Sequence, residues 1–91
     1  MKENVTRIID LLIDKLNERL AVQQIPVEMT QKAKAFVVDE AYNPEFGARP
    51  LRRYVQHTVE TMLSRKLLQG GLLHGSTVTV DVEQGKLILR I

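Results

Sequence analysis

Residues 42–53 read YNPEFGARPLRR, and this stretch separates two helical patterns in the chain. Pro44 disfavours the helical conformation for the residue before it, so the preceding helix is expected to end there. Gly47 permits a tight or left-handed turn. Pro50 suits the first position of a new helix, because its missing N–H would be unpaired there anyway. The stretch therefore predicts a helix end, a turn and a helix start in immediate succession.

Helical patterns also lie on both sides of this stretch. Segment 30–41 begins with Thr30, a good N-cap, and carries an apolar stripe. From residue 50 to the glycines at 70–71, apolar residues recur every four positions, which predicts one long third helix. Apolar residues at spacings of three and four predict a first helix over 5–20. The four-residue ladder of the third helix consists of Leu51, Val55, Val59, Leu63 and Leu67.

Alternating apolar and polar residues predict three strands. Segment 25–29 alternates in this way, and Pro26 places it at a strand start or at a sheet edge. Segments 77–83 and 87–91 alternate around a short turn, which predicts a β-hairpin. A lone hairpin is marginally stable, so we expect it to pair with the first strand. The expected fold is α+β, with helices packed on one face of a three-stranded sheet in the order α-β-α-α-β-β.

Composition limits what the chain can do alone. Its 91 residues suffice for one small domain, so we treat 1–91 as a single domain. Cysteine is absent, which excludes disulfides and a thiol nucleophile and fits a cytoplasmic location. Apolar runs are too short to cross a membrane, and two histidines are too few to indicate a metal site. A net charge of +2 is well below that of a typical polyanion binder.

Arg49 is the candidate functional residue. The glycine turn delivers it to a helix N-terminus, where unpaired N–H groups and the helix dipole favour an anion. A guanidinium at that place can make a forked contact with a phosphate. The alternative is an ordinary surface arginine that pairs with Glu45 or Asp39. The chain has no glycine-rich phosphate loop with its lysine and no evident Ser–His–Asp set, so a complete catalytic apparatus is not recognisable.

The chain resembles the C-terminal small domain of Clp/Hsp100 AAA+ ATPases along nearly its whole length. Residues 41–51, AYNPEFGARPL, are similar to the family's sensor-2 motif, in which Gly, Tyr, Asp and Pro lead to Gly-Ala-Arg-Pro-Leu. Ala41 stands where the family usually has Gly, Asn43 replaces the usual Asp, and Met62 stands where relatives often carry Pro. Further similar stretches are LNERL at 16–20, VEMT at 27–30, KLLQG at 66–70 and GSTVTVDV at 75–82.

This resemblance implies roles for particular residues. Arg49 would be the sensor-2 arginine, which reaches the ATP phosphates and links nucleotide state to the angle between two domains. Ala48 would contact the nucleotide beside it. Leu12 would line the base, and the alternative is that it is simply a core residue. Leu11 falls off the apolar face of its helix, either as a stray exposed residue or as a contact with something outside this chain.

The resemblance also implies cofactors and partners. The full-length protein would be a cytoplasmic homo-hexameric unfoldase or disaggregase that acts on unfolded proteins and binds ATP or ADP with Mg²⁺. The partners of this chain would be the large AAA+ domain of the same subunit and that of the neighbouring subunit, with a Clp peptidase as a further candidate. The chain would be one excised subdomain with Met1 as an expression start. Alone it would be inactive and would not bind nucleotide tightly.

Two other kinds of function stay open. Arg49, Arg52 and Arg53 suggest a small nucleic-acid-binding module, although the acidic face of the first helix and the lack of a basic-aromatic platform disfavour it. A free hairpin edge suggests a protein-interaction domain that works by strand addition. We expect neither nucleic acid nor a membrane as a partner.

Overall fold

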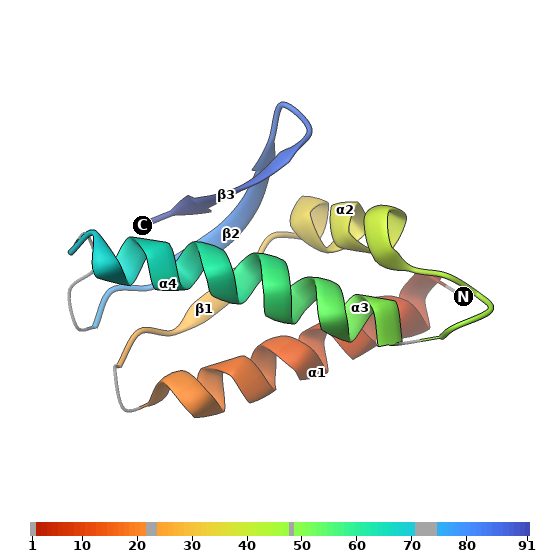
Figure 1. Ribbon diagram of the computed structural model, residues 1–91, viewed down its shortest axis with the longest axis horizontal. Helices are drawn as coiled ribbons and strands as arrows, with labels where there is room; N and C mark the ends of the chain where they lie inside the picture. The colour runs from red at the N-terminus through yellow and green to blue at the C-terminus, as the bar shows by residue number, and fades with distance from the viewer. Residues whose placement is uncertain (1, 22–23, 48, 71–74) are drawn as a thin grey trace.

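The computed structural model describes residues 2–21, 24–47, 49–70 and 75–91 (Figure 1). The long third helix is continuous but has three parts, since a π-helical segment, η2, joins α3 to α4. The predicted α+β class and order of elements are confirmed. The elements are α1 (Lys2–Leu20), β1 (Val27–Met29), α2 (Gln31–Ala41), α3 (Arg49–Tyr54), η2 (Val55–Val59), α4 (Glu60–Leu68), β2 (Val78–Glu83) and β3 (Lys86–Arg90).

The three strands form one mixed sheet in the order β1-β2-β3. β1 runs parallel to β2, and β2 runs antiparallel to β3, so the hairpin pairs with the first strand as predicted. β1 begins only at Val27, because Pro26 lacks the N–H of a ladder residue; its carbonyl accepts from the N–H of Val78. The hairpin turn places Gln84 and Gly85 at φ 52° and 73°. Two consecutive residues with positive φ form a tight turn whose backbone twist fits the right-handed twist of the two strands.

The helices pack together over one face of this sheet. α1 contacts β1 and α2, while α2 contacts β2 and α3 (Figure 1). α1 begins at Lys2 rather than at residue 5, and Lys2 and Glu3 are both good helix formers. Apolar side chains from every layer meet in one core, which explains how so small a chain folds. The core consists of Val5, Ile9, Ile13, Leu16, Ile25, Val27, Met29, Ala33, Val37, Val38, Leu51, Val55, Val59, Leu63, Val78 and Val80.

The π-helical segment has a cause in the sequence. A step of four residues overshoots one α-helical turn by about 40°, so a four-residue ladder would drift around the helix by roughly 160° over its length. A π turn is wider, with hydrogen bonds between residues five apart. The N–H of Glu60 donates to the carbonyl of Val55 in this way. The wide turn counteracts the drift, and the ladder from Leu51 to Leu63 stays buried. The predicted long helix is therefore confirmed, and the π segment is a feature that the periodicity did not predict.

Asn17 fastens α1 to the sheet. Its side-chain amide donates to the carbonyl of Val27 at 3.0 Å, and its side-chain oxygen accepts from the Val27 N–H at 2.7 Å. Both backbone groups belong to the first residue of β1, which is an edge strand among the described strands. One side chain therefore takes the place of a neighbouring strand at the sheet edge.

Replacement of Asn17 by alanine is expected to lower the free energy of unfolding by about 1–3 kcal/mol, because it leaves two part-buried backbone groups unpaired. Urea unfolding of the isolated domain measures this. Lys15→Ala on the exposed side of α1 is the control and should change stability by less than about 0.5 kcal/mol. Equal effects of the two substitutions would show that Asn17 does not fasten the strand.

Asp81 links the hairpin to the start of α2. Thr30 caps α2, as predicted, by accepting from the N–H of Ala33, and its hydroxyl donates to Asp81 at 2.8 Å. Asp81 also accepts from the N–H of Val82 and from the guanidinium of Arg90. The bond from Val82, followed by those from Thr30 and Arg90, holds the pKa of Asp81 below its ordinary value.

This lowered pKa predicts a pH dependence of stability. A carboxyl with a depressed folded-state pKa stabilises the fold above its ordinary pKa of 3.8, and this stabilisation disappears as the pH falls through the folded-state pKa. We expect the wild-type domain to be more stable than Asp81→Asn at pH 7 and the two to converge in acid. Thermal unfolding of both proteins from pH 7 to about pH 2 measures this difference in stability. A difference that stays constant with pH would contradict the prediction.

Candidate functional site

The loop between α2 and α3 is folded around Asn43. The carbonyl of Asn43 accepts from the N–H groups of Phe46 at 3.1 Å and Gly47 at 2.9 Å. Its side-chain oxygen accepts from the N–H of Glu45 at 2.8 Å. Gly47 has φ +66°, a left-handed conformation that glycine adopts without strain. The tight turn predicted before the arginine is confirmed.

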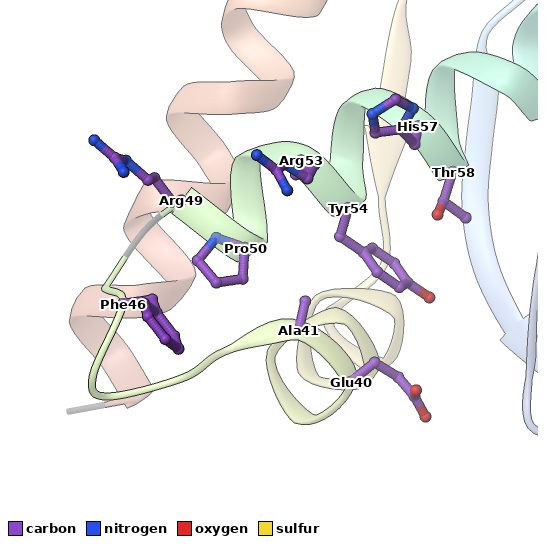
Figure 2. A pocket seen from close by; sticks show the side chains of 9 residues that line it. All are labelled: Glu40, Ala41, Phe46, Arg49, Pro50, Arg53, Tyr54, His57 and Thr58. Carbon is purple, nitrogen blue, oxygen red and sulfur yellow. The ribbon is translucent and has the colours of Figure 1, made fainter.

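Arg49 follows this turn as the first residue of α3, one place before the predicted start at Pro50. The residue is exposed, and it lies at an open hollow of about 660 Å³ between the end of α2, the loop and the long helix (Figure 2). Within the described residues it makes no ion pair with Glu45 or Asp39, so the ordinary pairing considered for it does not form. The hollow is lined by Glu40, Ala41, Phe46, Arg49, Pro50, Arg53, Tyr54, His57 and Thr58.

Basic side chains follow one edge of the hollow. Figure 2 shows Arg49, Arg53 and His57 projecting from the same side of the helix, while Tyr54 reaches towards α2 and Glu40. Burial, and to a lesser extent the negative charge of Glu40, raise the pKa of Tyr54 above its ordinary value. Tyr54 is therefore a neutral phenol at neutral pH. The hollow therefore brings the guanidinium groups of Arg49 and Arg53 together with the apolar side chains of Ala41, Phe46 and Pro50, and the carboxylate of Glu40 also lines it.

The structure does not bring all the predicted site residues together. Leu12 is half-buried against the core and lines a different hollow, of about 380 Å³, next to Lys15 and Arg52. Arg49 and Leu12 therefore lie at separate hollows, on different sides of the long helix. Ala48 lies outside the described residues. The exposed fraction of Leu11 is 61%, which agrees with both interpretations of that residue.

The three arginines of α3 do not form one strip. Arg53 lines the hollow of Arg49, whereas Arg52 lines the hollow of Leu12. This division weakens the nucleic-acid alternative, which needs a continuous basic surface. In the described part of the chain, no group of histidines and acidic residues has the arrangement of a metal site. No helix found there is long and apolar enough to cross a membrane.

Phe46 and Tyr54 are features of the site that sequence reasoning missed. The exposed fraction of Phe46 is 64%, and the residue stands on the loop beside Arg49. A large apolar residue within an otherwise polar turn is the signal that could have found it. Tyr54 belongs to the long helix but lies off the four-residue ladder, so periodicity alone assigns it no place.

The fold, together with the glycine turn that presents an arginine at a helix start, defines a C-terminal small domain of the Clp/Hsp100 class. A family model described as the C-terminal, D2-small domain of ClpB protein matches residues 1–80. The chain belongs to this family.

Relatives agree with this assignment along nearly the whole chain. The chain is 47% identical, over 96% of its length, to the chaperone protein ClpB of Nitratidesulfovibrio vulgaris. It is 46% identical, over 92%, to the ClpB of Bacillus cereus. It is 42% identical, over 98%, to a Bacillus subtilis protein named negative regulator of genetic competence ClpC/MecB. The matched region covers only 10%, 10% and 11% of these relatives, so the chain spans about a tenth of their length.

Proposed function

We propose that this chain is the C-terminal small subdomain of an ATP-dependent Clp-type protein unfoldase or disaggregase, and that it contributes Arg49 to the ATP site. The observation that carries the proposal is the exposed and unpaired state of Arg49. This arginine is exposed and makes no ion pair with the nearby carboxylates of the described residues, and it stands on a turn held by hydrogen bonds. A guanidinium in that state is free to meet a phosphate from another domain.

Arg49 acts by charge in this proposal. Bound ATP supplies the γ-phosphate, whose negative charge the guanidinium attracts and partly neutralises. Arg49 is rigidly connected to the rest of the domain, because Leu51, two residues further on, is fully buried. A movement of the guanidinium with the phosphate therefore moves the whole small domain. Hydrolysis then changes the angle between the two domains.

Arg53 and Leu12 extend the proposed nucleotide site. Arg53 lines the same hollow as Arg49 and adds positive charge beside the phosphates. Leu12, which lies at the second hollow, would with Ala48 provide the contact to the rest of the nucleotide. Mg²⁺ accompanies ATP in the site of the large domain.

Family membership supports further partners in this proposal. Residues 1–91 act as one unit against the large AAA+ domain of the same subunit and that of its neighbour, within a cytoplasmic homo-hexamer that works on unfolded proteins. A Clp peptidase is a further candidate partner. Exposed apolar residues such as Leu11 and Phe46 support a domain that another surface covers.

ATP hydrolysis by two proteins tests the proposal, namely the isolated chain and the full-length protein. The isolated chain is expected to unfold cooperatively yet neither hydrolyse ATP nor bind it tightly, whereas the full-length protein hydrolyses ATP and unfolds a tagged substrate. A full-length protein without ATPase activity would overturn the proposal, and so would hydrolysis by the isolated chain. A shift of DNA or RNA by the isolated chain at low ionic strength would instead support the nucleic-acid alternative.

A further inference from the structure

We infer that Asn43 is a positioning residue, which sets the place of Arg49 relative to the nucleotide without touching it. This inference rests on the proposed role of Arg49. Asn43 is half-buried at the end of α2, and three consecutive N–H groups converge on it, from Glu45, Phe46 and Gly47. The loop that carries the arginine is thus folded around a single residue.

Asn43 is itself fixed to the core through α2. The N–H of Tyr42 donates to the carbonyl of Val38 at 2.9 Å, and Val38 is buried. Asn43 comes directly after Tyr42 and pairs with Gly47 in an isolated antiparallel bridge. The path from the core of α2 to the turn is therefore short and hydrogen-bonded at each end.

The arginine lies between two such fixed points. Gly47 is bound to Asn43 on one side, and Leu51 is fully buried on the other. Arg49 is two positions from each of these points in the sequence. Phe46, whose N–H also donates to Asn43, lines the same hollow as Arg49 (Figure 2). Asn43 therefore organises two of the residues that line the hollow.

The side chain of Asn43 has a specific part in this. Its oxygen binds the N–H of Glu45, two residues on, and such a bond holds an asparagine backbone in the turn conformation. That conformation aims the Asn43 carbonyl at Phe46 and Gly47. Alanine removes the acceptor, whereas aspartate retains it. The structure therefore assigns the positioning role to an acceptor oxygen at this place, with no need for the amide N–H₂.

Turnover of ATP by the full-length protein tests the inference. Asn43→Ala is expected to lower kcat about 2- to 10-fold, as expected for one lost hydrogen bond, with a smaller change in KM. Asn43→Asp should keep kcat near that of the wild type. Asn43→Ser, which keeps a shorter acceptor, serves if Asn43→Ala does not fold, and it should fall between the two.

Asn17→Ala is the matched control, because it also removes side-chain hydrogen bonds to the backbone but acts at the α1–β1 edge. It should destabilise the isolated domain at least as much as Asn43→Ala and leave kcat unchanged. The inference is wrong if Asn43→Ala keeps the wild-type kcat, or if Asn17→Ala lowers kcat equally. Wild-type turnover by Arg49→Ala would mean instead that the proposed function fails.

Discussion

Replacement of Arg49 by alanine in the full-length protein is expected to lower ATP turnover about 10- to 100-fold. The estimate corresponds to the loss of hydrogen bonds from a charged group to the phosphates, worth roughly 1.5–3 kcal/mol. We expect the stability of the fold to be unchanged, because the side chain of Arg49 is exposed and makes no ion pair or hydrogen bond among the described residues. The isolated Arg49→Ala domain should therefore melt at nearly the same temperature as the wild type.

Arg53→Ala is the matched control for this substitution. Arg53 lines the same hollow and projects from the same side of the helix (Figure 2). Its replacement by alanine removes the same charge as that of Arg49. Because Arg53 lies one turn further along the helix, we expect its charge to act on the phosphates from a greater distance than that of Arg49, with a smaller loss of turnover, below about 5-fold. Equal losses from the two substitutions would show that general positive charge, rather than the place of Arg49, matters.

Replacement of Leu51 by alanine is expected to lower the free energy of unfolding of the isolated domain by about 2–5 kcal/mol, the usual cost of such a cavity. Leu51 is fully buried, and it begins the ladder that attaches the long helix to the core. A domain of this size has little stability in reserve, so the loss is a large part of the total. The same change also loosens the anchor of Arg49.

Urea unfolding with Leu68→Ala as the control measures this effect. The exposed fraction of Leu68 is 87%, although it is the same residue type in the same long helix. Its replacement should change stability by less than about 0.5 kcal/mol. A similar loss from both leucines would contradict the core described above.

Much of the fold could be predicted because two periodicities are strong in this chain. The spacing of three and four in α1 and the four-residue ladder after Pro50 identify the buried faces of the helices. The alternation of β2 and β3 identifies the hairpin, and Gly47 identifies the turn before Arg49. These features depend on local backbone preference and on burial, which a sequence displays directly.

The remaining features depend on contacts between distant residues. The amide of Asn17 binds a strand ten positions away, and Thr30 binds Asp81 across the domain. No local pattern marks either pair. Lys34 of α2 likewise pairs with Asp10 on the acidic face of α1, with 2.6 Å between the ammonium nitrogen and the carboxylate oxygen. The separation of Leu12 from the hollow of Arg49 likewise follows from how α1 and the long helix pack.

Nucleotide discrimination by the full-length protein tests the central claim most directly. Binding of ADP and of a non-hydrolysable ATP analogue is measured for the wild type and for Arg49→Ala. If Arg49 meets the γ-phosphate, its replacement weakens the binding of the ATP analogue about 10-fold or more and leaves ADP binding nearly unchanged. Unchanged affinity for both nucleotides, or an equal loss for both, would contradict the claim that this domain senses the γ-phosphate through Arg49.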